Sequence, residues 1–225
     1  MTKKIYHGSE FIIEQPQYGY GKTYNDYGQG FYCTEEAIMA KEWGVGYERD
    51  GYANCYEIDM TGLKVLDLNA DVYCELHWLA ILLENREFDA HSALGYEAKE
   101  YIKAHFLIDY SDYDIIIGYR ADDSYFSFAQ DFINGAISYR QLTNALRLGN
   151  LGQQFVLKSK KAFEQIRFLG AEVAKYDEWY TRKELRDKGA RRDYFDLEHN
   201  RRQKRDIFIT QVIDEEMRAD DSRLR

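Results

Sequence analysis

The chain has 225 residues, of which 45% are hydrophobic and 16% aromatic, and it carries a formal net charge of −9. This length suffices for one packed core with a smaller appendage, and the composition excludes a chain that is disordered throughout. No run of about 18 apolar residues is present, and Lys3 and Lys4 lead into polar residues, so we expect a cytoplasmic protein without membrane contact.

Charge and cysteine content restrict the partners further. Residues 172–225 hold equal numbers of basic and acidic side chains, so the net negative charge lies in residues 1–171. An acidic body is poorly suited to grip nucleic acid over a wide surface, because such binding depends on Lys and Arg. Cys33, Cys55 and Cys74 have neither paired nor metal-type spacing, so we expect buried thiols and no metal site.

The first third of the chain predicts short strands joined by loops. A segment rich in Gly, Tyr, Asn and Asp, residues 18–30, is typical of a flexible surface loop. Thr34 is placed to cap a helix that continues through about Trp43, with two glutamates in its first turn. Strands are predicted for residues 3–9, 31–34, 54–60 and 63–68.

Helical periodicity and β-branched runs define the remaining elements. Helices are predicted for residues 71–87, 93–107, 124–147 with a break near Gly135, and 161–169, and strands for residues 114–119 and 154–158. From residue 171 onward the chain is charged and helical in propensity, with a break near Gly189. Regular strand-helix-strand units are lacking, which predicts an α+β fold, and no GxGxxG motif follows a strand, which argues against a Rossmann domain.

Four short motifs carry the functional prediction through their order and spacing. They are Tyr6-His7-Gly8-Ser9, the segment Asn25 to Thr34, Trp43, and Gln153 to Ser159. Together they resemble the ADP-ribosyltransferase superfamily, in the His-Tyr-Glu branch that includes diphtheria toxin and the poly(ADP-ribose) polymerases. Closest is an uncharacterised bacterial family of that branch with Gln in place of the catalytic Glu.

The resemblance covers residues 4–169 and implies NAD as substrate, held in a split β-sheet core with flanking helices. It divides the chain into an ADP-ribosyltransferase-like catalytic domain, residues 1–170, and a charged helical C-terminal extension, residues 171–225. The implied activity is mono-ADP-ribosyl transfer to a macromolecular acceptor by a bacterial or phage toxin, defence factor or effector. An intracellular toxin of this kind would need an inhibitor protein, or antitoxin, as a partner.

The resemblance also implies individual roles. His7 would bind a ribose hydroxyl, Gly8 would meet the nicotinamide carboxamide through its backbone, and Gln154 would contact the ribose 2′-hydroxyl. Tyr32 and Trp43 would sandwich the cationic nicotinamide ring, an arrangement that aromatic faces favour. The implied catalytic residues are His7, Tyr32 and Gln154, and the implied NAD-binding residues are His7, Gly8, Ser9, Asn25, Asp26, Gly28, Gly30, Tyr32, Thr34 and Trp43.

Gln154 is the main departure from the family pattern. An amide offers a dipole and a hydrogen bond where a carboxylate offers a full charge, so chain-extending polymer synthesis is not expected. Gln153 competes for the same role, and we choose Gln154 because it directly precedes the Phe-Val-Leu run. Asp122 and Asp123 follow a predicted strand and could supply a base for the acceptor, although helix caps would look the same.

Each motif residue also has a structural interpretation, since an isolated His, Tyr or Trp more often serves packing than catalysis. A catalytically degenerate NAD-binding or protein-interaction module is therefore one alternative. A second alternative is ADP-ribosylation of nucleic acid, suggested by the basic stretch 182–205, which could equally be a solvated helical face.

Overall fold

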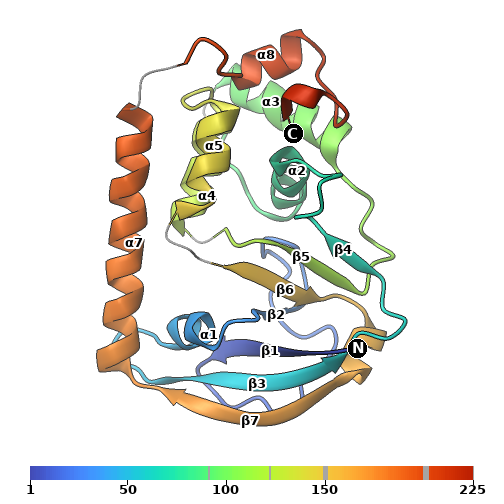
Figure 1. Cartoon of the computed structure of the whole chain (residues 1–225), viewed down its shortest axis with the longest axis vertical. Coiled ribbons are helices and arrows are strands. Elements are labelled where there is room, and N and C mark those ends of the chain that lie inside the picture. The colour runs from blue at the N-terminus through green and yellow to red at the C-terminus, as the bar shows by residue number, and fades with distance from the viewer. Residues whose placement is uncertain (91, 122, 149–151, 200–202, 225) are drawn as a thin grey trace.

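The computed structural model describes the chain except residues 91, 122, 149–151, 200–202 and 225 and the side chains of residues 123, 124 and 197–199. Within this part, seven strands form two sheets and eight α-helices surround them (Figure 1). The strands are β1 (Thr2–Ser9), β2 (Phe31–Cys33), β3 (Gly51–Asp59), β4 (Val65–Asp67), β5 (Ile115–Tyr119), β6 (Gln153–Leu157) and β7 (Ile166–Ala174). The helices are α1 (Ala37–Gly44), α2 (Glu75–Asn85), α3 (Ala93–Phe106), α4 (Asp123–Ile133), α5 (Tyr139–Ala145), α6 (Lys160–Glu164), α7 (Tyr176–His199) and α8 (Ile209–Asp214).

The predicted α+β class is confirmed, and the strands form two separate sheets. The first has the order β1-β3-β7 and is antiparallel, and the second has the order β2-β6-β5-β4, in which β4 and β5 are parallel. The sheets meet where Tyr6 of β1 and Thr34, just after β2, exchange two backbone hydrogen bonds of 2.8 Å. Within the described residues, this isolated bridge is the backbone pairing between the two sheets, and β1 and β2 diverge beside it.

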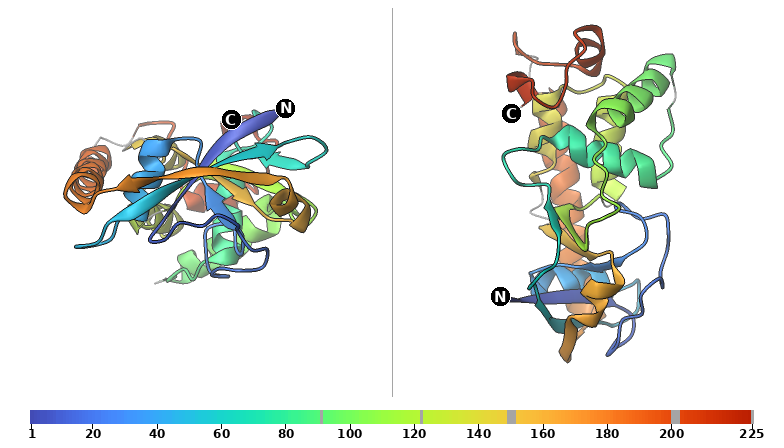
Figure 2. Two further views of the ribbon diagram at one scale, coloured as in Figure 1. Left: turned by 90° about the horizontal axis from the view of Figure 1, so that it is seen from below. Right: turned by 90° about the vertical axis from the view of Figure 1, so that its right-hand side faces the viewer.

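The two sheets and a helical layer stack along the long axis of the molecule (Figures 1 and 2). The alternation of side chains along β5 and β6 sends residues to opposite faces of the second sheet. Ile115 and Phe155 join a buried cluster with Ile5 and Tyr56 of the first sheet, whereas Val156 joins the larger cluster beneath the helices. The first sheet therefore forms one end of the molecule, and helices α2 to α5 with α8 form the other.

The residues after α7 return to the helical layer. Ile209, Val212 and Leu224 are fully buried in the larger core cluster, and the Tyr139 hydroxyl donates to the Leu224 carbonyl at 2.8 Å. The C-terminal segment therefore shares a core with the helices that precede it.

Helix α1 begins later than the sequence predicts. Thr34 is 1% exposed and lies two residues before the N-cap; its backbone bonds to Tyr6, and its hydroxyl oxygen accepts from the Glu36 N–H at 3.2 Å. Glu36 occupies the N-cap position without a side-chain bond, and the first turn of α1 contains no acidic residue. The pairing of the two sheets outweighs the local capping propensity of Thr34.

Two predictions about the C-terminal third are wrong. The helix expected over residues 161–169 ends at Glu164, and β7 follows it as the edge strand beside β3. Gly189 does not break the last long helix, because α7 continues through it to His199. Strand β7 also crosses the boundary predicted between residues 170 and 171, so any extension begins after Ala174.

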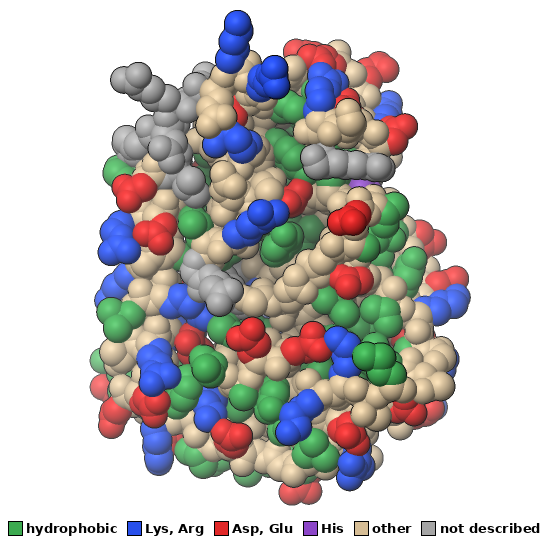
Figure 3. Space-filling model, in the orientation of Figure 1, with side chains coloured by type: hydrophobic (Ala, Val, Ile, Leu, Met, Phe, Trp, Pro, Cys, Tyr) green, Lys and Arg blue, Asp and Glu red, His purple; other side chains and the backbone are tan. Residues whose placement is uncertain are grey.

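Figure 3 shows basic and acidic side chains interspersed over one face of the molecule, without a broad area of one sign. Among the described residues, no helix is long and apolar enough to cross a membrane.

Candidate functional site

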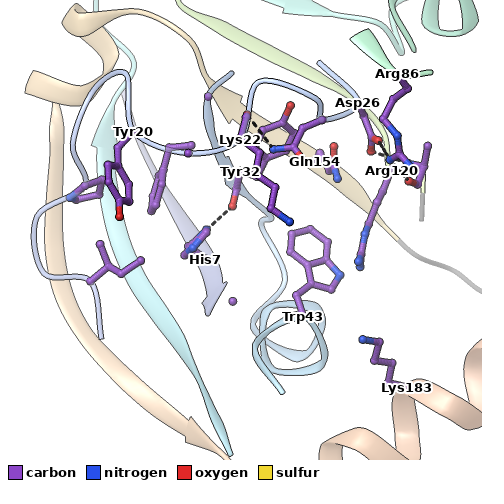
Figure 4. A pocket seen from close by; sticks show the side chains of 18 of the residues that line it. His7, Tyr20, Lys22, Asp26, Tyr32, Trp43, Arg86, Arg120, Gln154 and Lys183 are labelled. Atoms are coloured by element: carbon purple, nitrogen blue, oxygen red, sulfur yellow. Dashed lines mark hydrogen bonds and ion pairs between the residues drawn. The ribbon is translucent and has the colours of Figure 1, made fainter. Parts of the chain in front are cut away.

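A cavity of about 600 Å³ opens beside the split between β1 and β2. Its volume falls within the range of about 300–1,000 Å³ that is usual for small-molecule sites. The walls come from β1, β2, α1, the loop before β2, the ends of β5 and β6, and α7 (Figure 4). Eight of the predicted site residues line it: His7, Gly8, Asn25, Asp26, Gly30, Tyr32, Trp43 and Gln154.

His7 spans the split. Its Nδ1 lies 2.6 Å from the Tyr32 carbonyl oxygen, and its ring stacks on Phe31 with centroids 4.3 Å apart. A carbonyl oxygen can only accept, so Nδ1 carries the proton and Nε2 of the neutral ring keeps a lone pair. Burial lowers the pKa of His7 below its ordinary value, which favours this neutral form. The site thus presents a hydrogen-bond acceptor at Nε2.

Tyr32 fastens the loop before β2. Its hydroxyl accepts from the Tyr27 N–H at 3.0 Å and donates to the Gly28 carbonyl at 2.5 Å. Burial raises the pKa of the Tyr32 phenol above its ordinary value, so the hydroxyl stays protonated and can donate. The hydroxyl is therefore occupied by the protein, and the ring remains as the part of Tyr32 that could contact a ligand.

The same loop has two further anchors. Asp26 is 5% exposed; one carboxylate oxygen accepts from Arg86 and the other from the Ala121 N–H, each at 2.9 Å. Lys158 donates to the carbonyls of Tyr27 and Gln29 at 2.5 and 2.6 Å, and burial lowers the pKa of Lys158 to about 8. Asp26 thus serves to hold the loop, and the flexible segment predicted over residues 18–30 is tied down in its second half.

Gly8 brings helix α1 against β1. A Cβ at this position would lie 2.1 Å from the Ala40 carbonyl oxygen and 2.8 Å from the Gly44 nitrogen. The close approach places Trp43 of α1 beside the cavity, so Gly8 has a packing role whatever it binds. Gly30 is similar, because a Cβ there would lie 2.8 Å from the Leu157 carbonyl oxygen.

Trp43 already has a cation beside it. The Arg120 guanidinium, just after β5, lies 4.5 Å from the centre of the indole ring. Cations favour the faces of aromatic rings, with tryptophan the strongest partner. The buried Nε1 atom of Trp43 has no hydrogen-bond partner among the described residues. The indole therefore attracts positive charge and keeps one unused donor.

Of the two neighbouring glutamines, Gln154 lines the cavity and Gln153 does not. Gln154 is 6% exposed and lines the cavity, and its Oε1 atom has no hydrogen-bond partner among the described residues. Gln153 is exposed and exchanges two side-chain bonds with Asn69, of 2.6 and 2.8 Å. A buried acceptor without a partner is unusual in a folded protein and fits a residue that contacts a ligand.

Five predicted residues lie elsewhere or outside the description. Ser9 bonds to Asn54 and to the Phe11 carbonyl. Gly28 is a turn residue with φ 70°, and Thr34 belongs to the bridge between the sheets. None of Ser9, Gly28 and Thr34 is among the residues that line the cavity. Asp122 lies outside the described residues, as does the side chain of Asp123, which begins α4.

Basic residues are the part of the site that the motifs missed. Six of them line the cavity against two acidic residues, Asp26 and Asp187, in a protein whose net charge is −9. Arg86 is paired with Asp26, and Arg186 with the buried Glu42. The six are Lys22, Arg86, Arg120, Lys183, Arg186 and Arg191. The only sequence signal for the last three was the charged run of α7, which does not reveal which face points inward.

The arrangement can bind an anionic ligand that also carries a flat cationic group. The basic residues suit phosphate, and Tyr32 and Trp43 supply aromatic rings. His7 and Gln154 offer an imidazole lone pair and an amide to hydroxyl groups. Within the described residues, no group of three or more His, Cys, Asp or Glu is placed to hold a metal ion.

Comparison with known proteins gives one match. No curated protein and no solved structure matches the chain. The model of the family described as "Protein of unknown function (DUF3990)" matches residues 3–168, which run from β1 into β7. This match covers most of the chain and includes all the predicted cavity residues. The chain therefore belongs to the DUF3990 family.

Proposed function

We propose that the protein is an NAD-dependent mono-ADP-ribosyltransferase that acts on a macromolecular acceptor. The observation that carries the proposal is the convergence of His7, Tyr32, Trp43 and Gln154, spread over some 150 positions, on one cavity. Motif order, spacing and the family resemblance had predicted these residues from the sequence. A structural role for each would not require them to share a cavity.

The charges and unpaired atoms of the cavity support the same ligand. NAD combines a cationic pyridinium ring with a diphosphate, and the cavity combines aromatic rings with an excess of basic groups. The His7 lone pair and the Gln154 amide oxygen are acceptors suited to ribose hydroxyls. The positive charge of Arg120 on the indole marks a face that the pyridinium ring would take after Arg120 moves aside.

In the proposed reaction, the bond between the ribose C1′ and the nicotinamide nitrogen breaks, and its electron pair leaves with neutral nicotinamide. The acceptor forms a bond to C1′ from the opposite face and loses a proton to solvent. The ribose passes through an oxocarbenium-like state, which preorganised dipoles can stabilise. The Gln154 carbonyl oxygen would point its negative end toward that charge, and the rings of Tyr32 and Trp43 would hold the leaving group.

The test is the release of nicotinamide from NAD, measured by chromatography with and without cell extract. Gln154→Ala should lower the rate by about tenfold or more, the value of a hydrogen bond to a charged group. Gln153→Ala is the matched control, because the neighbouring amide is exposed and bonds to Asn69. It should change the rate by less than about twofold.

The proposal fails if the wild-type protein neither binds NAD nor releases nicotinamide in any extract. NAD binding without turnover would support the degenerate binding module, which the amide at position 154 favours. In that case Gln154→Glu, which restores the carboxylate of the branch, should introduce turnover.

A further inference from the structure

Helix α7 presents charged residues on the face where apolar residues are usual. Trp179, Ala190 and Tyr194 are buried, and Lys183 and Arg191 fall on the same helical stripe, at intervals of three and four residues. Yet Lys183 and Arg191 line the cavity. Figure 4 shows Lys183 extending from α7 toward Trp43. Lys183 is half-buried and Arg191 is exposed, so neither side chain is needed to pack α7 against the body.

The helix is fixed on both sides of this charged stretch. Near its start, Trp179 packs with Val45 and Ala174. Near its end, Tyr194 stacks on Phe128 with centroids 3.8 Å apart, and its hydroxyl donates to Asp131 at 2.5 Å. At these two positions, apolar and aromatic contacts hold α7 against the body, and neither Lys183 nor Arg191 takes part in them.

Between these ends, a buried ion pair joins α7 to α1. Arg186 pairs with Glu42, which is 5% exposed, and its Nη1 lies 2.8 Å from the Met39 sulfur. Burial raises the pKa of Glu42, and the Arg186 guanidinium opposes that shift. The charge of Arg186 is therefore compensated inside the protein.

Besides Arg86 and Arg186, four basic side chains line the cavity. Lys183 and Arg191 approach it from α7, Arg120 from the end of β5, and Lys22 from the loop before β2, with Asp187 as the opposing acid on α7. Lys183 and Arg191 lie about 12 Å apart along the helix axis. Long flexible side chains can converge over that separation on one multiply charged group.

We propose that Lys183 and Arg191 of α7, together with Arg120, bind the diphosphate of the dinucleotide. This inference rests on the proposed function and adds to it the residues that bind the diphosphate. The family match ends at residue 168, so two of these three residues, Lys183 and Arg191, lie beyond the matched region. The C-terminal region is then part of the substrate site.

The experiment measures the affinity of the full chain for three ligands by isothermal titration calorimetry. Inorganic pyrophosphate and ADP-ribose contain the diphosphate, whereas nicotinamide mononucleotide carries a single phosphate. The test variant is K183Q/R191Q. The control is K188Q/R192Q, which removes two charges from the same helix at side chains that are 72% and 75% exposed.

In K183Q/R191Q, the affinity for ADP-ribose and pyrophosphate should fall by about tenfold or more, because hydrogen bonds from charged donors are lost. Nicotinamide mononucleotide should lose less than about threefold, and the control variant less than about twofold for every ligand. Thermal melting of each variant checks the fold, which the contacts of Trp179 and Tyr194 should preserve.

Unchanged affinity for ADP-ribose in K183Q/R191Q, in a protein that still releases nicotinamide, overturns this inference and leaves the proposed function standing. Equal losses in K183Q/R191Q and K188Q/R192Q also overturn it, because they indicate a long-range effect of net charge. Pyrophosphate binding that depends on Lys183 and Arg191, in a protein that never cleaves NAD, supports the phosphate wall and contradicts the proposed function.

Discussion

His7 occupies the point where the two sheets separate, and its chemistry follows from one contact. The Tyr32 carbonyl fixes the proton on Nδ1, and burial lowers the pKa of the imidazole. A protonated ring would lose the lone pair on Nε2 and would add positive charge to a cavity that already has an excess of it. We therefore expect the neutral form to be the one that functions.

The lowered pKa of His7 predicts a defined dependence of stability on pH. The pKa of the imidazole is about 6.5 in the unfolded chain and lower in the folded protein. At pH values between these two pKa values, the unfolded state binds more protons than the folded state. The free energy of unfolding contributed by His7 is thus complete above about pH 6.5 and declines on acidification.

Urea unfolding of the wild-type protein and His7→Gln at a series of pH values measures this contribution. The advantage of the wild type should be constant above about pH 7 and should shrink toward pH 5. An advantage that grows on acidification would mean that the folded protein prefers the charged ring.

Gly8 and Gly189 provide a matched pair of glycine substitutions. A Cβ on Gly8 would collide with the Ala40 carbonyl at 2.1 Å, whereas a Cβ on Gly189 in α7 would meet nothing within 4 Å. Gly8→Ala should lower the free energy of unfolding by about 1–3 kcal/mol, the usual cost of overpacking. Gly189→Ala should raise it by about 0.5–1 kcal/mol, because alanine favours the helix.

Chemical denaturation of both variants measures the two effects. A neutral Gly8→Ala variant would contradict the close packing of α1 on β1 that positions Trp43.

At the scale of elements, the loop before β2 depends on a few side chains for its shape. Tyr32 and Lys158 together make four hydrogen bonds to the backbone of residues 27–29. Tyr32→Phe keeps the ring that would stack on nicotinamide and removes the two bonds of the hydroxyl. Comparing it with Tyr32→Ala therefore separates the anchoring of the loop from the stacking of the ring.

We predict that Tyr32→Phe speeds amide hydrogen exchange in residues 27–30 and weakens NAD binding by a few-fold, about the value of one or two neutral hydrogen bonds. Tyr32→Ala should weaken binding further, since it also removes the aromatic face. Equal losses in both variants would mean that the ring makes no contact with the ligand.

Most elements could be predicted from the sequence because their signals are local. The β-branched run of β5 and the apolar periodicity of α2 need no knowledge of the rest of the chain. Strand β7 could not be predicted in this way, since its residues form a strand through pairing with β3 at the sheet edge. Gly189 stays helical because tertiary contacts hold α7 on both sides of it, which a local propensity does not reveal.

The candidate site was predicted only in part, because only some of its residues lie in segments with a local sequence signal. Short motifs identified eight residues of the cavity, because each motif is a short continuous segment of the sequence. The basic residues were missed, since Lys183 and Arg191 belong to a helix with charges around its circumference, and periodicity alone cannot tell which charged face turns inward. Arg86 and Arg120 follow the ends of α2 and β5 without any motif.

At the scale of the whole molecule, the charge that lines the cavity is opposite in sign to the net charge of the protein. The protein has a net charge of −9, while the cavity beside the sheet split has more basic than acidic lining residues. The second sheet supplies Tyr32 and Gln154, α1 supplies Trp43, and α7 supplies Lys183, Arg186 and Arg191. Residues from both ends of the described chain therefore line one cavity.

The most direct test of this account is a crystal structure of the protein soaked with NAD. We expect the nicotinamide ring against Tyr32 and Trp43, with Arg120 displaced from the indole, His7 Nε2 bonded to a ribose hydroxyl, and the diphosphate facing Lys183 and Arg191. An empty cavity at saturating NAD, or NAD bound at another place with His7 and Gln154 untouched, would contradict the account.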